Sequence, residues 1–190
     1  YIYMNKIILC VYNGMFFDEI QSYFDNTDFG EIKLDFYIGD ISKIEVLKNT
    51  CFLSPANSFG YMDGGIDETY SSMFNGIQQK VQNKIKNYPF KTCGGNPYIP
   101  IGSSILIPLN EIFHINKCFL ISAPTMFRPS NITTTNNAYI AMLSTMSLIK
   151  KYNNSFCDKD KENRINTLIC PMLCTGYGGM SFKQSSMQIK

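Results

Sequence analysis

The sequence predicts an α/β protein, a three-layer α/β/α sandwich built on a mixed, mostly parallel sheet of about six strands. Short continuous apolar runs alternate along the chain with segments whose apolar residues recur every three or four positions. The first pattern is typical of buried strands and the second of amphipathic helices. The length of 190 residues corresponds to one domain, because domains usually hold roughly 100–200 residues. We therefore expect residues 1–190 to form a single domain whose last helix is cut short where the sequence ends.

The segments that we expect to form strands are apolar or strand-like and are bounded by turn-forming residues. They span residues 6–12, 33–38, 51–53, 103–108, 118–122 and 167–173. Helices are expected at 16–24, 44–47, 66–86 and 133–149, and from Phe182 onward. The segment 66–86 is expected to be one long helix, because its apolar residues form a single stripe at helical spacing. In such sheets ligands bind outside the carboxyl ends of the strands, so we look for the site in the loops there.

Composition and charge exclude several classes of protein. Hydrophobic residues make up 45% of the chain and charged residues 17%, a balance that excludes intrinsic disorder. The net charge of +2 provides no broad field for non-specific binding to nucleic acid. No apolar run approaches the roughly 18 residues of a membrane span, and no signal peptide is recognisable. We expect a soluble, intracellular monomer, cytoplasmic or nuclear, that has no membrane partner.

The cysteines and the histidine argue against metal and nucleophilic chemistry. Seven cysteines are an odd number, they form no Cys-x-x-Cys pair, and several lie in apolar runs, so a disulfide framework is not expected. His114 is the only histidine. A zinc site and a Ser-His-Asp or Cys-His catalytic group are therefore not expected either. We expect no metal and no cofactor.

A glycine-rich turn follows the last apolar run. The sequence Thr-Gly-Tyr-Gly-Gly at 175–179 lies between an expected strand and an expected helix, which suits a phosphate cradle built from backbone amides and a helix N-terminus. It lacks the Gly-Lys-[Ser/Thr] of a Walker loop. The alternative is an ordinary tight connection between strand and helix, and this segment by itself does not decide between the two.

A second segment is more distinctive, because it combines Asn57-Ser58 with the run Gly-Gly-Ile-Asp at 64–67. It resembles the first ligand loop of the macro domain family, whose pattern is Asn-Ala-Ala-Asn-Ser, a spacer, a glycine run, an aliphatic residue and Asp. Three further segments resemble motifs of that family in the same order along the chain. They are Gly-Asp-Ile-Ser at 39–42, Ser-Ala-Pro at 122–124 and the second ligand loop at 175–180. The resemblance covers the chain almost end to end and implies the macro domain fold.

The resemblance also implies a ligand, ADP-ribose, and a role for each motif. Asp40 would accept a hydrogen bond from the adenine amino group beside the amide of Ile41, and Asn57 would hold hydroxyls of the distal ribose. Met180 occupies a position where the family often places an aromatic residue against that ribose. The diphosphate would be surrounded by the backbone of Gly64, Gly65, Ile66, Thr175, Gly176, Tyr177, Gly178 and Gly179. The alternatives are structural, in that Asp40 caps a helix and Asn57 satisfies a turn.

Catalysis is less well supported by the same motifs. In hydrolytic members of the family, activity is associated with an Asn, an Asp and a His, and the corresponding residues here are Ser54, Asp67 and Ser71. Asp67 could polarise a water near the anomeric carbon, with Asn57 as the second catalytic candidate, or it could cap a helix.

We therefore expect binding of ADP-ribose, free or attached to a macromolecule, with hydrolysis of ADP-ribosyl linkages or of ADP-ribose 1''-phosphate as a further expectation. The alternatives are a non-catalytic ADP-ribose reader and a module that binds nucleotides or poly(A). Nucleic acid is expected as a partner only where it is a modified substrate, since no basic stripe with interleaved aromatic residues appears in the sequence.

Overall fold

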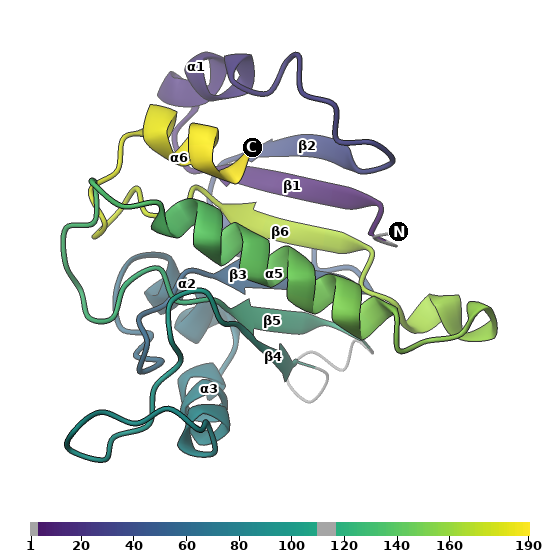
Figure 1. Cartoon of the computed structure of the whole chain (residues 1–190). Coiled ribbons are helices and arrows are strands. Elements are labelled where there is room, and N and C mark those ends of the chain that lie inside the picture. The colour runs from purple at the N-terminus through teal and green to yellow at the C-terminus, as the bar shows by residue number, and fades with distance from the viewer. Residues whose placement is uncertain (1–3, 110–116) are drawn as a thin grey trace.

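The computed structural model describes residues 4–109 and 117–190, so His114 lies outside the described residues. The described strands form one mixed sheet in the order β2-β1-β6-β3-β5-β4, in which β4 alone runs antiparallel to its neighbour (Figure 1). This confirms the predicted mixed, mostly parallel sheet. The strands are β1 (Lys6–Val11), β2 (Lys33–Ile38), β3 (Thr50–Ser54), β4 (Ile105–Pro108), β5 (Phe119–Ser122) and β6 (Thr167–Pro171).

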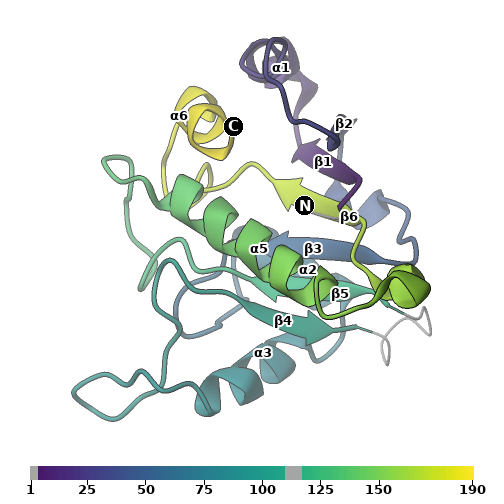
Figure 2. The ribbon, with the colours of Figure 1, turned by 45° about the vertical axis from the view of Figure 1, so that its right-hand side comes forward.

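Helices cover both faces of the sheet and complete the three layers. The α-helices are α1 (Phe17–Ser22), α2 (Gly65–Met73), α3 (Ile77–Lys86), α5 (Asn137–Asn153) and α6 (Phe182–Ile189). Short 3-10 turns are η1 (Gly14–Phe16), η2 (Ile41–Lys43) and η3 (Asp158–Asn163). Helix α5 crosses one face, and α2 lies behind the sheet (Figure 1; Figure 2 turns the same ribbon). No helix among residues 4–109 and 117–190 is long and apolar enough to cross a membrane.

Two apolar cores hold the layers together. Successive residues of β3 point to opposite faces, so Leu53 joins the core beneath α5, whereas Phe52 joins the core beneath α2 and α3. Both side chains are fully buried. The ring of Phe52 lies 5.8 Å from that of Tyr70 and 5.1 Å from that of Phe74, measured between centroids. Burial on both faces explains why β3 has a continuous apolar sequence.

The expected long helix at 66–86 is wrong, because the chain breaks between α2 and α3. Phe74 leaves the helical region with φ −121° and ψ 79°, and Gly76 has a left-handed backbone with φ 78°. The break keeps Phe74 and Ile77 buried against the same core. The dipeptide Asn75-Gly76 is a turn signal that the uninterrupted apolar stripe masks.

Of the other expected helices, one is absent and another is shifted at both ends. Residues 44–47 do not form a helix, since Ile44 is extended and the turn η2 lies just before it. The helix expected at 133–149 begins at Asn137 and ends at Asn153. The buried amide of Asn153 donates to the carbonyl of Ile165 (2.7 Å) and accepts from its N–H (2.8 Å). This pair ties the end of α5 to the segment leading into β6.

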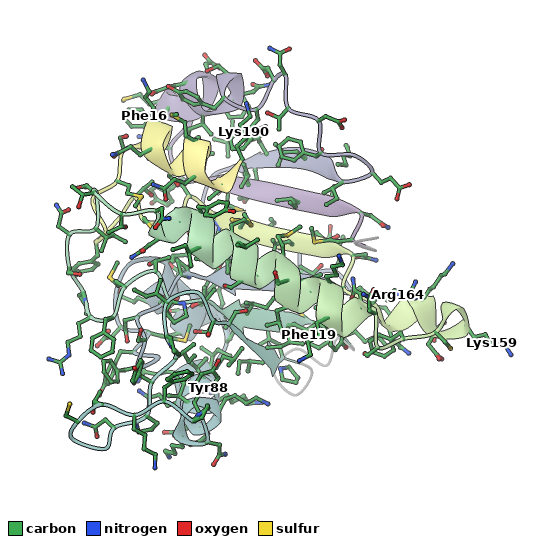
Figure 3. The ribbon with its side chains drawn as sticks, viewed as in Figure 1. Phe16, Tyr88, Phe119, Lys159, Arg164 and Lys190 are labelled. Carbon is green, nitrogen blue, oxygen red and sulfur yellow. The ribbon has the colours of Figure 1, made fainter. Side chains whose placement is uncertain are left out.

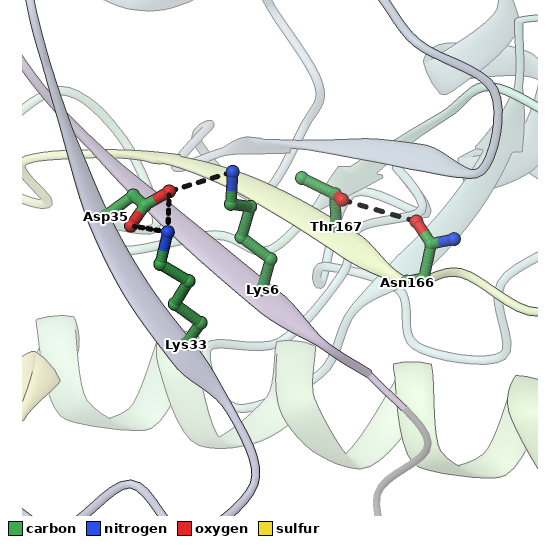
Figure 4. A network of polar contacts seen from close by, with 5 residues as sticks. All are labelled: Lys6, Lys33, Asp35, Asn166 and Thr167. Atoms are coloured by element: carbon green, nitrogen blue, oxygen red, sulfur yellow. Dashed lines mark hydrogen bonds and ion pairs between the residues drawn. The ribbon is translucent and has the colours of Figure 1, made fainter.

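Charged side chains on β1 and β2, the outer pair of strands, lie close together across the two strands. Lys6 and Lys33 are opposite each other in β1 and β2, and their ammonium groups lie 2.8 and 3.0 Å from carboxylate oxygens of Asp35 (Figure 4). Hydrogen bonds from both lysines lower the pKa of Asp35. Exposed pairs of this kind contribute little to stability. Charges on an edge strand do, however, discourage pairing with the edge of another molecule.

The topology gathers the loops that matter at one edge of the sheet. The parallel strands all end there, and antiparallel β4 begins there, since Ile105 pairs with Ser122, the last residue of β5. The long segment 87–104 before β4 therefore joins the loops that follow the other strands, on the left of Figure 1.

Candidate functional site

A cleft of about 740 Å³ opens at this edge, a volume within the usual range for small-molecule sites. The motif residues meet in it although they come from distant parts of the chain. Those lining it are Asp40, Ile41, Asn57, Gly64, Gly65, Ile66, Asp67, Thr175, Gly176, Tyr177 and Gly178. Gly179 and Met180 do not line it.

The strand order fixes the order of the loops along the cleft. Asp40 follows β2 at one end of the sheet, the turn 175–178 follows β6, the loop 55–67 follows β3, and Met126 and Pro129 follow β5. The two glycine-bearing loops are therefore neighbours in the middle of the cleft. Asp40 lies at one end, and Met126 with Pro129 lies at the other.

Asp40 is exposed and caps the turn η2, as the structural alternative expected. Its Oδ1 accepts a hydrogen bond from the N–H of Ser42 (2.9 Å), and this N–H together with the Ser42 hydroxyl lowers the pKa of Asp40. The carboxylate still borders the cleft. Capping thus holds an ionised acceptor in place at this end without removing it from the site.

Two phenylalanines form an aromatic wall that the sequence motifs did not indicate. Phe16 in η1 and Phe182 at the start of α6 both line the cleft, and their ring centroids lie 4.8 Å apart at an angle of 33°. Figure 3 labels Phe16 beside α6. The position of Phe182 directly after the second glycine loop was an available signal. The role of Phe16, which follows β1, could not be predicted from the sequence, because only the fold brings it next to Phe182.

Asn57 organises the first loop. Its Oδ1 accepts from the N–H groups of Phe59 (3.0 Å) and Tyr61 (3.4 Å), and its Nδ2 donates to the carbonyl of Tyr61 (2.8 Å). The turn function expected as an alternative is therefore present. One N–H of the amide has no partner among the described residues and remains for a ligand.

The rest of the first loop is tied to the helices beneath it. The N–H of Met62 donates to Oε1 of Gln78, and the hydroxyl of Ser71 donates to the carbonyl of Met62, each at 2.7 Å. Gly65 then starts α2 with φ 60°, and no side chain caps this helix. The first amides of α2 consequently face the cleft without a capping side chain, which suits an anion.

Asp67 is not the cap of α2, contrary to the structural alternative. It is buried, with 8% of its surface exposed, and the hydroxyl of Ser54 donates to its Oδ1 at 2.5 Å. Burial raises the pKa of Asp67 to about 7, and the nearby charge of Asp63 adds to this, while the Ser54 bond acts in the opposite direction. A carboxyl group that exchanges its proton near neutral pH therefore lies in the cleft.

The second loop is tightly folded. Gly178 is buried, and a Cβ added there would lie 2.6 Å from the carbonyl oxygen of Cys174. The N–H of Met180 donates to the same oxygen (3.0 Å), which turns the Met180 side chain into the core, 3% exposed. The expected contact of Met180 with a ribose is therefore not supported. Tyr177 instead reaches across the cleft, since a Cβ added at Gly64 would lie 3.1 Å from its ring.

Charged and nucleophilic groups in the cleft limit its chemistry. None of the described residues that line it is a lysine or arginine, so an anion there must be held by neutral donors, that is, by backbone amides and by amide or hydroxyl side chains. Burial raises the pKa of Cys10 to about 12 and that of Cys174 to about 11, so both thiols stay neutral and weakly nucleophilic. Residues 4–109 and 117–190 contain no cluster of His, Cys, Asp or Glu that could hold a metal ion.

Comparisons with known proteins bear on the family and the fold. The family model described as a macro-like domain matches residues 37–189, which include both ligand loops. The solved macrodomain of Mycobacterium tuberculosis DarG is similar in structure, with a TM-score of 0.57 and 14% identity over 80% of this chain and 83% of that one. At this identity the likeness establishes the shared fold. The chain belongs to the family of macro-like domains.

Proposed function

We propose that the cleft binds ADP-ribose, free or attached to a macromolecule. The observation that carries the proposal is the pairing of two amide-rich elements, the uncapped start of α2 at Gly64–Ile66 and the turn 175–178, across a cleft without cationic side chains. Together they offer a diphosphate a set of backbone donors.

The two ends of the cleft differ in a way that matches the two ends of this ligand. Asp40 accepts hydrogen bonds at one end, where the Phe16–Phe182 wall offers an aromatic surface to adenine. Beyond the glycine loops, the free N–H of Asn57 and the carboxyl of Asp67 suit the hydroxyls and anomeric carbon of the distal ribose.

Gly176→Glu tests the proposal. Gly176 is exposed and a Cβ there meets nothing within 4 Å, so the fold tolerates a side chain whose charge repels a diphosphate. We expect calorimetry to show that ADP-ribose binding is lost while the melting temperature stays unchanged. Gly94→Glu, an equal change at an exposed glycine outside the cleft, is the matched control. Full binding by Gly176→Glu would refute the proposal.

Asp67 favours hydrolysis as a second candidate function. A buried carboxyl with a pKa of about 7 can act as acid or base at neutral pH, and Ser54 fixes its orientation. Ser71 stands in the position of the family's histidine, and its hydroxyl donates a hydrogen bond to the carbonyl of Met62. Asp67 would thus act without an imidazole, on an ADP-ribosyl linkage or on ADP-ribose 1''-phosphate.

Single-turnover measurements distinguish hydrolysis from non-catalytic binding of ADP-ribose. We expect Asp67→Asn to slow release from these substrates about 10²–10⁴-fold while ADP-ribose affinity changes little. A wild-type protein that binds ADP-ribose and releases no product would instead be a reader. Competition of oligo(A) with ADP-ribose for the cleft would favour the nucleotide or poly(A) module.

A further inference from the structure

Outside the cleft, five aromatic side chains from three separate loops meet on the same edge of the molecule. This aromatic surface consists of Phe59, Tyr88, Phe90, Tyr98 and Phe127. Neighbouring ring centroids lie 4.9 to 6.3 Å apart, so the rings form one continuous cluster. In sequence they are scattered from 59 to 127, which is why no aromatic stripe appears before the chain folds.

Part of this cluster is open to solvent. Phe90 is 50% exposed and Phe127 is 41% exposed. The ring of Phe127 stands nearly perpendicular to those of Phe59 (68°) and Tyr98 (82°). The guanidinium of Arg128 lies over the ring of Phe59, 5.7 Å from its centroid. Exposed rings beside a stacked guanidinium form a surface on which other planar groups can stack.

The three segments that carry the rings, 55–62, 87–104 and 123–137, contain no Asp or Glu, and their cations are Lys91 and Arg128. The acidic residues of the first loop, Asp63 and Asp67, follow the ring-bearing segment and line the cleft. Neither cation forms an ion pair with any residue that the structure describes. Two cations without ion pairs, next to exposed aromatic rings, suit a partner that carries both negative charges and planar rings.

The aromatic surface adjoins the far end of the cleft. Asn57, Met126 and Pro129 line the cleft and flank Phe59 and Phe127 in the chain. The opposite end is marked by the aromatic wall, and Figure 3 shows its Phe16 well separated from Tyr88, which lies beside α3.

We propose that the aromatic surface binds single-stranded nucleic acid, with bases stacked on Phe90 and Phe127 and phosphates at Lys91 and Arg128. Single strands are bound elsewhere by this combination of exposed rings and basic side chains, which tolerates many sequences. An acidic peptide without aromatic residues, such as poly-glutamate, would satisfy the cations but has no planar rings to stack on the surface. The inference does not depend on ADP-ribose binding, because an unmodified strand suffices.

The experiment measures fluorescence anisotropy of labelled, unmodified single-stranded DNA and RNA oligonucleotides with the whole chain. We expect binding that weakens as salt rises and that is stronger than for the matching duplex, whose bases are covered. Phe90→Ala and Phe127→Ala should each weaken binding about 5-fold to 100-fold. Arg128→Ala should also weaken it and flatten the salt dependence.

Matched controls keep the outcome clear. Tyr139→Ala and Lys150→Ala remove an exposed ring and an exposed cation from α5, outside the three loops, and should leave oligonucleotide binding unchanged. Calorimetry of the Phe90 and Phe127 variants with ADP-ribose should show unaltered affinity, which separates this surface from the cleft. The proposal is overturned if the wild type binds no single strand, if the ring variants bind it fully, or if a poly-glutamate peptide binds in its place.

Discussion

The side chain of Asp67 occupies the first turn of α2, yet burial and not the helix governs its affinity for protons. An N-terminal turn favours a charged carboxylate, whereas desolvation in the cleft favours the neutral acid and raises the pKa to about 7. Ser54 supplies one hydrogen bond, which is too little to restore the ordinary value.

Asp67 should therefore make stability depend on pH in the direction opposite to a salt-bridged aspartate. Between about pH 4 and pH 7 the folded chain holds a proton on this group that the unfolded chain has released, so stability falls as pH rises through that window. We expect the melting temperature of Asp67→Asn, relative to that of the wild type at the same pH, to increase from pH 5 to pH 8. A difference that stays constant across this range would contradict the raised pKa.

At the scale of elements, the strands were predictable and the helix boundaries were not. Buried parallel strands give continuous apolar runs, and β1 and β5 appear close to where such runs lie. The stripe in 66–86 continues across the α2–α3 break because both helices face one core, so periodicity by itself cannot reveal the interruption.

The same limit applies to the site. The glycine loops were predictable, because their residues are adjacent in sequence and Gly64–Asp67 resemble a family motif. The Phe16–Phe182 wall was not, because the fold alone brings residues from the two ends of the chain together. Met180 was placed in the site by its position in the motif, but the tight turn at Gly178 directs it inward.

The break between α2 and α3 can be tested at its glycine. Gly76 is exposed, and its φ of 78° is strained for any residue with a Cβ, so Gly76→Ala should lower the free energy of unfolding by about 1–3 kcal/mol. Gly94→Ala is the control, since Gly94 is also exposed but is not among the glycines with positive φ. Denaturant unfolding of both variants measures the difference, and equal midpoints would show that the break is not strained.

At the scale of the whole molecule, the cleft joins the loops that follow β2, β1, β6, β3 and β5, so a ligand that spans it should stabilise the fold as a unit. Ligand at 100 times its dissociation constant adds about 2.7 kcal/mol to the stability of a protein that binds it only when folded. We expect AMP to engage the end at Asp40 and ribose 5-phosphate the end at Asp67, whereas ADP-ribose should reach both.

Thermal shift should therefore rank the ligands by length. We expect ADP-ribose to raise the melting temperature more than AMP or ribose 5-phosphate at equal concentration, because each fragment forgoes the contacts at one end. Gly176→Glu should abolish the shift by ADP-ribose, which serves as the control for effects outside the cleft. An equal shift by AMP would show that the distal half of the cleft contributes nothing.

The ring of Tyr177 lies close to Gly64, so a side chain of the second glycine loop approaches the backbone of the first where both line the cleft. Tyr177 is 72% exposed, so the surrounding core does little to hold it, and side chains of this kind rotate in picoseconds to nanoseconds. A ligand whose two wide ends lie on either side of a narrow middle must pass this ring to enter or leave. We therefore expect the residence time of such a ligand to depend on the phenol ring of Tyr177 more strongly than its equilibrium affinity does.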